Sequence, residues 1–235
     1  MSRIITYVDG FNLYHGAKEL MSSSSNASTW KWLDLFHLSS RLCPNDEVVK
    51  VKYFTARVKS LNPKSSTANN QHAYLRALAT QPQMETILGQ FDYRKSRMPL
   101  VKPPSLTKYR IHRLIGLPLQ RYADGNISIP VWRTEEKATD VNLGSHLISD
   151  AFKDHFETAL VISNDSDLCE PIRLTVHDLG KKVIVVNPRG HRQQSVSIKN
   201  VASEVRNLRA AALTASQLPH VLHDEFGTIH KPEDW

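Results

Sequence analysis

A short apolar run that breaks directly into two carboxylates constrains this chain more than any other feature. Ala159–Ile162 is followed by Asp165 and Asp167. Four successive apolar residues are typical of a parallel strand that is covered on both faces. The apolar spacing that follows, closed by Gly180, predicts a helix packed back on the sheet. The two aspartates then lie at the carboxyl end of a strand, where open α/β sheets bind ligands.

A plainer interpretation is that one of these aspartates only caps the helix. An Asp at the N-cap accepts hydrogen bonds from free backbone N–H groups and interacts favourably with the helix dipole. One cap accounts for one carboxylate, however. Two carboxylates a few ångströms apart repel by roughly 4 kcal/mol at an effective dielectric of about 20. The second acid therefore indicates a compensating cation, and both interpretations stay open at this point.

The length and composition allow one large α/β domain or at most two small ones, since the chain has 235 residues and 40% of them are hydrophobic. Cys43 and Cys169 form no CxxC pair, so the sequence indicates neither a disulfide framework nor a cysteine-based zinc site. No segment approaches the ~20 apolar residues of a membrane span, and the N-terminus does not resemble a signal peptide. We expect a soluble, cytoplasmic protein.

Two further acids follow predicted strands. Asp9 comes directly after the strand expected at residues 3–8, and Gly10 lets the chain turn tightly into a helix that begins near Asn12. Asp140 lies in the first turn of a helix that follows the strand expected at 127–132, with Thr139 as the expected N-cap. Each acid also has a plain explanation, because Asp-Gly is an ordinary turn and an acid in a first turn complements the helix dipole.

The other predicted elements complete an alternation of strands and helices. We expect strands at residues 47–58, 86–93 and 182–187, and helices at 13–21, 32–42, 70–80 and 200–212. Such an alternation predicts an α/β fold with a parallel sheet.

Residues 91–137 are strongly basic. They hold ten Lys and Arg against four acids, a net charge of +6 out of +7 for the whole chain. Tyrosines and a tryptophan lie between the basic residues, and this combination can pair with phosphates and stack on bases of single-stranded nucleic acid. We therefore take Tyr109, Arg110 and Arg113 as candidate substrate contacts. The alternative is a loop whose lysines and arginines serve only solubility.

Taken together, the four aspartates predict a metal site. Asp9, Asp140, Asp165 and Asp167 all fall at the same edge of one inferred sheet, where four carboxylates would repel one another without a cation. Oxygen-only ligands suit Mg²⁺ or Mn²⁺, which retain waters and bind phosphates. The chemistry that this predicts is metal-assisted hydrolysis of phosphodiester bonds.

Three motifs resemble those of the NYN domains of the PIN-like nuclease group, close to the LabA-like branch. The first is Val8-Asp9-Gly10-Phe11-Asn12, the second Lys137-Ala138-Thr139-Asp140-Val141, and the third Ser163-Asn164-Asp165-Ser166-Asp167-Leu168. Their order and spacing fit over about residues 3 to 190. The third motif has Asn164 where the family commonly has Gly.

The resemblance implies a PIN-like parallel sheet flanked by helices on both faces, and metal-dependent cleavage of RNA. It implies that the four aspartates hold the metal and are catalytic, that Asn12 and Ser163 orient the site or the substrate, and that Lys137 contacts a phosphate. We expect a nuclease domain over residues 1–208 with a basic insertion at about 94–126, and a C-terminal tail over 209–235. The expected partner is nucleic acid, with RNA favoured and no membrane, and a homodimer is left open.

Three alternatives remain from the sequence. The chain could be a regulatory protein that binds nucleic acid with little catalysis, or a nuclease that acts on DNA, since no feature reads a 2′-hydroxyl. A haloacid-dehalogenase-type phosphatase also uses acids at strand ends. It would require a second Asp two residues after Asp9, where this chain has Phe11.

Overall fold

The described residues separate into two compact units. The computed structural model describes residues 1–22, 30–58, 65–102, 105, 107–110, 116, 118–191, 194–233 and 235. Unit 1 consists of Met1–Gln90 and Ala138–Trp235, and unit 2 consists of Phe91–Lys137. Unit 2 contains the segment 94–126 that we expected to be an insertion, and residues 209–235, expected to be a tail, belong to unit 1.

The fold is α/β, as predicted, with a mostly parallel sheet of eight strands in the order β4-β5-β3-β2-β1-β6-β7-β8. The strands are β1 (Arg3–Asp9), β2 (Glu47–Ala56), β3 (Met84–Pro99), β4 (Gln120–Arg121), β5 (Ile127–Lys137), β6 (Thr158–Ile162), β7 (Lys182–Asn187) and β8 (Glu204–Asn207). A separate hairpin joins β9 (Val221–Asp224) to β10 (Gly227–His230). Among the described helices, none is both long and apolar enough to cross a membrane.

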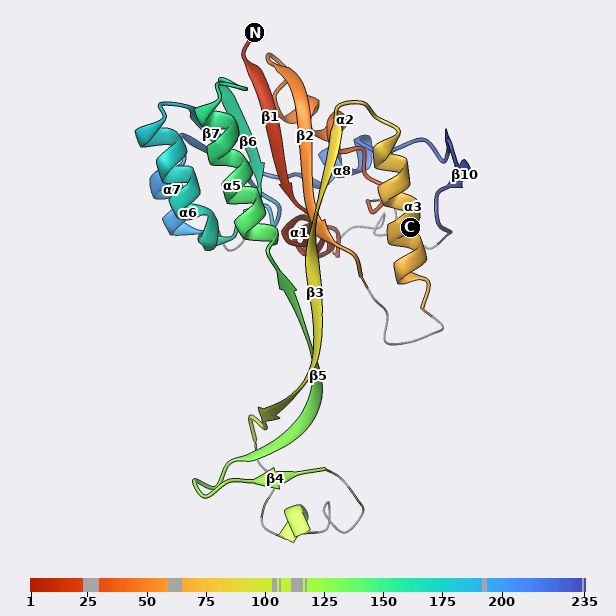
Figure 1. The fold of residues 1–235 in the computed structure, drawn as a ribbon, viewed down its shortest axis with the longest axis vertical. Helices are drawn as coiled ribbons and strands as arrows, with labels where there is room; N and C mark the ends of the chain where they lie inside the picture. The colour runs from red at the N-terminus through yellow and green to blue at the C-terminus, as the bar shows by residue number, and fades with distance from the viewer. Residues whose placement is uncertain are drawn as a thin grey trace. The chain divides into compact units, whose positions relative to one another are not determined.

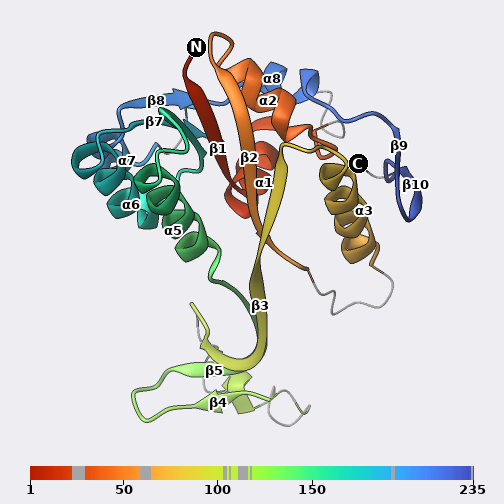
Figure 2. The same ribbon diagram turned by 45° about the horizontal axis from the view of Figure 1, so that its top comes forward.

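The helices of unit 1 cover the two faces of the sheet (Figure 1; Figure 2). They are α1 (Gly10–Met21), α2 (Leu35–Leu42), α3 (Thr67–Ala79), α5 (Thr139–Phe152), α6 (Cys169–Arg173), α7 (Val196–Val201) and α8 (Ala210–Ala215). Side chains of α1, α2, α3 and α8 pack in one hydrophobic cluster, and those of α5, α6 and α7 pack in a second one.

Strand β1 supplies both clusters because successive side chains of a strand point to opposite faces. Ile4 and Val8 belong to the first cluster, and Ile5 and Tyr7 belong to the second. All four side chains are buried. This explains why the central strands are continuous apolar runs rather than alternating ones.

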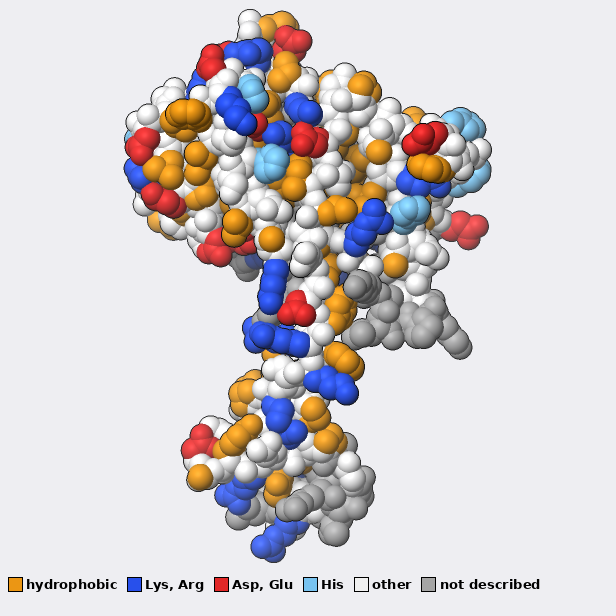
Figure 3. All heavy atoms as spheres, viewed as in Figure 1, with side chains coloured by type: hydrophobic (Ala, Val, Ile, Leu, Met, Phe, Trp, Pro, Cys, Tyr) orange, Lys and Arg blue, Asp and Glu red, His pale blue; other side chains and the backbone are white. Residues whose placement is uncertain are grey.

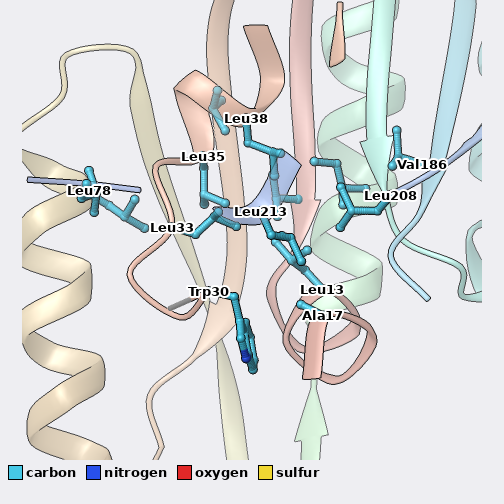
Figure 4. Packing of buried hydrophobic residues seen from close by; sticks show 14 of the residues in the cluster. Leu13, Ala17, Trp30, Leu33, Leu35, Leu38, Leu78, Val186, Leu208 and Leu213 are labelled. Carbon is cyan, nitrogen blue, oxygen red and sulfur yellow. The ribbon is translucent and has the colours of Figure 1, made fainter. Parts of the chain in front are cut away.

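The first cluster joins the end of the chain to its beginning. Figure 4 shows Leu13 and Ala17 of α1 lying beside Leu208 and Leu213, with Leu35 and Leu38 of α2 on the same side of the sheet. Leu208 follows β8 directly and is buried. The connection from β8 to α8 is therefore anchored in the core.

Three local predictions were wrong. The helix expected at 200–212 is instead the end of α7, the strand β8 and the start of α8, because residues 204–207 pair in parallel with β7. The N-cap of α5 is Ala138, with a left-handed φ of 73°, rather than Thr139. Strand β3 runs from Met84 to Pro99, well beyond the expected end at residue 93.

A buried ion pair lies under α5. The Lys52 ammonium donates to Asp150 Oδ2 at 2.6 Å, and the Tyr7 hydroxyl donates to the same oxygen at 2.7 Å. The Lys52 and Asp150 side chains are 8% and 7% exposed. Burial alone would raise the pKa of Asp150, but the hydrogen bonds from Lys52 and Tyr7 outweigh it and hold the pKa below its usual range. The pair ties β2 to α5 across the sheet face.

We predict that Asp150→Asn destabilises the fold by about 3–5 kcal/mol, because it leaves the Lys52 ammonium buried without a counter-charge. The double variant Lys52→Met with Asp150→Asn should recover part of this loss, since no charge then stays buried. Urea unfolding of both variants measures the effect. Asp178→Asn, which removes a half-exposed partner of Arg173, is the control and should change stability by less than about 1 kcal/mol. Equal effects of Asp150→Asn and Asp178→Asn would contradict the prediction.

Candidate functional site

The first predicted site residue, Asp9, is almost fully buried at the carboxyl end of β1, with 4% of its surface exposed. Its Oδ1 accepts a hydrogen bond from the backbone N–H of Asn12 at 2.9 Å, so Asp9 is the N-cap of α1. Its Oδ2 accepts from the Ser163 hydroxyl at 2.9 Å. The carboxylate therefore joins the ends of β1 and β6, which are parallel neighbours in the sheet.

Asn12 and Ser163 hold the loop after β6 in place. The Asn12 side-chain oxygen accepts from the backbone N–H of Asn164 at 3.0 Å, and the Ser163 hydroxyl accepts from that of Asp165 at 3.1 Å. Asn164 Oδ1 in turn accepts from the backbone N–H of Ser195 at 2.9 Å. The residue that departs from the family pattern thus makes a contact that a glycine has no side chain to make.

The two aspartates after β6 have different surroundings. Asp165 is the N-cap of the 3-10 turn Ser166–Leu168 and accepts from the backbone N–H of Asp167 at 3.0 Å. The plain capping interpretation therefore holds for Asp165. Asp167 instead lines a cavity of about 370 Å³ together with Asp140 of α5.

The four aspartates are close enough to influence one another. The pKa of Asp9 is raised to about 6, mainly by burial and to a smaller extent by the charges of Asp140 and Asp165, while the hydrogen bonds from Asn12 and Ser163 act to lower it. Burial also raises the pKa of Asp140, with added repulsion from Asp165 and Asp167. This edge of the sheet carries mutually repelling carboxylates, as the sequence predicted.

The four aspartates do not converge on one point in this structure, and their role as metal ligands stays a prediction. Over the part of the chain that the structure describes, no three His, Cys, Asp or Glu side chains are grouped so that they could hold one ion. Asp9 is turned toward Ser163 and Asn12, and Asp165 toward the start of its own turn. Asp140 and Asp167 line a common cavity.

The predicted nucleic-acid contacts lie in unit 2. Arg110 is exposed and Tyr109 is half-buried, whereas Arg113 lies outside the described residues. Lys137 donates to Asp92 at 3.0 Å, so a carboxylate of unit 2 already partners it. Figure 3 shows Lys and Arg side chains over β3, β5 and β4. A role for these residues in binding nucleic acid stays a prediction.

A second cavity opens beside the end of β1, one residue from Asp9. It measures about 260 Å³ and is lined by aromatic side chains together with a few polar ones. The aromatic residues are Phe11, Tyr14, Tyr53, Tyr74 and Trp235, and His15, Lys31, Asn70 and Gln71 are among the polar ones. We call this the aromatic cavity.

The walls of the aromatic cavity are held in place by their own contacts. The Tyr74 hydroxyl donates to the carbonyl of Leu33 at 2.8 Å, and its ring lies 5.5 Å from Trp235 and 6.2 Å from Tyr53. Gln71 donates to the carbonyl of Ala56 and accepts from the N–H of Val58, both at 2.8 Å.

Gly10 permits this close packing. A Cβ at this position would lie 2.8 Å from the carbonyl oxygen of Phe54 and from the Tyr53 ring. Gly10 therefore does more than allow the predicted turn, because it also lets the start of α1 lie close to β2.

The sequence did not reveal this cavity. Tyr53 lies in the strand expected at residues 47–58, and Trp235 lies in the C-terminal tail expected at 209–235. Their shared role depends on the packing of the C-terminal residues against α3 and β2, which no local pattern signals. The one local signal was Gly10 directly after a buried strand, since a glycine there permits close approach of another chain segment.

Comparison with known proteins gives one curated relative with an activity. The chain is 26% identical over an alignment of 251 residues to 6-hydroxy-3-succinoylpyridine 3-monooxygenase HspA of Pseudomonas putida (strain DSM 28022 / S16), covering 97% of this chain and 74% of that protein. No family model matches the chain.

Solved structures give weaker similarities. A protein of unknown function from Vibrio parahaemolyticus RIMD 2210633 has a TM-score of 0.49 and 18% identity, covering 88% of this chain and 93% of that one. Sir2Tm bound to a propionylated peptide has a TM-score of 0.38 and 11% identity, with 91% of each chain covered.

The prediction of a metal-dependent nuclease is wrong, because the relative that matches nearly the whole chain is a monooxygenase. The same finding contradicts the assignment as a hydrolase or ribonuclease. It also contradicts the two alternatives, a DNA nuclease and a regulatory protein without useful catalysis. The physical reason is that acids at strand ends are not specific for phosphodiester hydrolysis. Here two of them, Asp9 and Asp165, are engaged as N-caps.

The raised pKa of Asp9 predicts a pH dependence of stability. The folded protein binds the Asp9 proton more tightly than the unfolded chain does, so the contribution of Asp9 to stability is fully present below the unfolded pKa of 3.8 and is lost as pH rises through about 6. The shift corresponds to roughly 3 kcal/mol. Urea unfolding between these pH values should show a smaller decline for Asp9→Asn, which keeps an N-cap side chain but does not titrate. Parallel curves for the two proteins would contradict the pKa shift.

Proposed function

We propose that this protein is an oxidoreductase of the monooxygenase type that hydroxylates a small aromatic compound bound in the aromatic cavity. The observation that carries the proposal is the cavity itself, which has five aromatic side chains at the carboxyl edge of a parallel sheet. That edge is where α/β folds bind their ligands. Support comes from the relative, whose name states that it acts on a hydroxylated succinoylpyridine.

The size and lining of the cavity suit a single small ring. Its volume of about 260 Å³ is at the small end of ligand pockets, which measure roughly 300–1,000 Å³. Tyr53, Tyr74 and Trp235 offer ring faces and edges for offset or edge-to-face stacking. His15 and Lys31 add polar groups that can orient a hydroxyl or an acidic substituent.

In the proposed reaction one atom of dioxygen enters the ring and the other leaves as water. Two electrons and two protons are required, and a reduced nicotinamide nucleotide with one proton from water supplies them. The residues of this chain would bind the ring, hold its orientation and exclude water from one face of it. His15 lies at the cavity wall and would accept a hydrogen bond from a ring hydroxyl.

Oxygen incorporation tests the proposal. Purified full-length protein is incubated with hydroxypyridines and hydroxybenzoates, reduced nicotinamide nucleotides and ¹⁸O₂, and the products are analysed by mass spectrometry. We expect one labelled oxygen in the product. Trp235→Leu should raise KM by roughly 5- to 30-fold, since a lost aromatic contact costs about 1–2 kcal/mol.

Trp132→Leu is the matched control, because Trp132 is a 54% exposed tryptophan of unit 2. It should leave KM unchanged. Absence of labelled product with every compound would overturn the proposed activity. Equal effects of the two tryptophan variants would overturn the assignment of the aromatic cavity as the substrate site.

We also infer that Asp140 and Asp167 can share one Mg²⁺ or Mn²⁺ ion. Both line the 370 Å³ cavity, and Mg²⁺ is commonly bound through one or two carboxylates while its remaining positions keep water. The repulsion that raises the pKa of Asp140 favours a cation there. This is a smaller site than the four-carboxylate one predicted from the sequence.

Thermal melting tests this inference. Mn²⁺ should raise the melting temperature of the wild-type protein by mass action, and Asp167→Asn should remove most of that increase. Glu225→Gln, at an exposed acid of the β9–β10 hairpin, should keep it. An increase that survives in Asp167→Asn would place the ion elsewhere, and no increase in the wild type would exclude the site.

The resemblance to NYN domains remains a proposal about fold. It is supported by the contacts of its first and third motifs, which meet through Asp9 and Ser163 at 2.9 Å and through Asn12 and Asn164 at 3.0 Å. We propose that these residues are retained because they join the ends of β1 and β6. We also propose that the basic segment at about residues 94–126 is an insertion into this NYN-like fold.

A further inference from the structure

A third cavity lies far along the sheet from the aromatic cavity, beside β8. It measures about 560 Å³ and is lined by residues from the end of α2, from β8, from the start of α8 and from the turn after β7. Its charged and polar residues are Arg41, His191, Arg206, Asn207 and Arg209. We call it the arginine cavity.

Positive charge in the arginine cavity is only partly neutralised. Arg206 donates to Glu204 at 2.6 Å and to the carbonyl of Leu42 at 2.6 Å. Arg41 and Arg209 are exposed, and within the described part of the chain neither forms an ion pair or a side-chain hydrogen bond. The cavity is therefore lined by two guanidinium groups that have no partner among the described residues, in addition to that of Arg206.

A polar atom at the wall also lacks a partner. Asn207 Oδ1 is buried and accepts no hydrogen bond from any residue that the structure describes. Its Nδ2 lies 3.1 Å from His191 Nδ1. A buried acceptor without a donor costs about 1–3 kcal/mol, and a bound molecule with an O–H or N–H group would remove this cost.

The backbone that carries these groups is fixed. Leu208, between Asn207 and Arg209, is buried with Leu13 and Leu213 in the core (Figure 4). The N–H of Leu208 donates to the carbonyl of Asn187 at 3.0 Å. The Arg206 guanidinium is held by Glu204 and by the carbonyl of Leu42, so this part of the cavity wall is preformed.

The chemistry of the lining selects the ligand. Planar guanidinium groups bind phosphate and carboxylate oxygens with paired hydrogen bonds. Two free guanidiniums match the charge of a phosphomonoester, about −1.5 to −2 at neutral pH, better than the single charge of a carboxylate. The volume of about 560 Å³ exceeds what a phosphate group fills, and it leaves room for an attached organic part that can donate to Asn207.

We propose that the arginine cavity binds a phosphate-bearing small molecule of the nucleotide class through Arg41, Arg206 and Arg209. The site is separate from the aromatic cavity, with which it shares no lining residue. The proposal therefore does not depend on the proposed monooxygenase activity.

Calorimetric titration of the full chain with ADP, inorganic pyrophosphate and a single-stranded RNA oligonucleotide tests it. ADP and pyrophosphate should bind the wild type, with ADP tighter because its organic part also fills the cavity. Arg41→Gln and Arg209→Gln should each weaken ADP binding by roughly 10- to 150-fold, since each removes a charge-assisted hydrogen bond to phosphate. Arg206 is left unchanged because it also anchors α2 to β8.

Arg57→Gln is the matched control: this exposed arginine follows β2 and removes the same charge away from the arginine cavity. It should leave ADP binding unchanged. Failure of both ADP and pyrophosphate to bind at millimolar concentration overturns the proposal. A second outcome also overturns it: the wild type binds RNA but not ADP, and Arg41→Gln and Arg209→Gln abolish the RNA binding. The arginines would then bind a nucleic acid. If Arg57→Gln weakened ADP binding as much as Arg41→Gln and Arg209→Gln do, the loss of affinity would reflect net charge alone, and the proposal would also be overturned.

Discussion

The parallel pairing of β1 with β2 on one side and β6 on the other is the constraint on which the rest of unit 1 depends. A strand in that position has both faces covered, so its side chains must supply two hydrophobic clusters at once. Parallel pairing also brings the carboxyl ends of all three strands to one edge. The Asp9–Ser163 hydrogen bond and the Gly10–Tyr53 contact both exist because of that shared edge.

The polar groups inside unit 1 are of two kinds. Lys52, Asp150 and Tyr7 form a pair of opposite charges with an added hydroxyl donor, so the charges are compensated where they are buried. Asp9 has hydrogen-bond donors but forms no ion pair with any residue that the structure describes, and its pKa is raised to about 6, mainly by burial. Burial disfavours the charged form of both carboxylates, but Lys52 and Tyr7 outweigh this effect at Asp150. A buried acid of the second kind is more typical of a functional site than of a structural one.

The aromatic cavity, the cavity of Asp140 and Asp167 and the arginine cavity differ in chemistry as well as in place. The aromatic cavity presents ring faces, the cavity of Asp140 and Asp167 presents carboxylates, and the arginine cavity presents guanidiniums. The first two lie at strand ends where the sequence analysis predicted a site, the aromatic cavity next to Asp9 and the second cavity at Asp140 and Asp167. The third lies at the edge strand β8, which the sequence did not predict.

The sequence by itself determined the α/β class, the central strands and the edge at which the acids collect. Apolar runs such as Ala159–Ile162 and turns such as Asp9-Gly10 are local patterns that predict strands and strand ends. Parallel pairing then brings the carboxyl ends of these strands to one edge of the sheet. Only the tertiary structure decided which groups face which. Residues 204–207 became a strand because β7 offered an edge to pair with, against their helical pattern. Trp235 reached Tyr74 because the C-terminal segment packs back on α3. Contacts between residues far apart in the chain leave no periodic signal, so the aromatic and arginine cavities could not be read from the sequence.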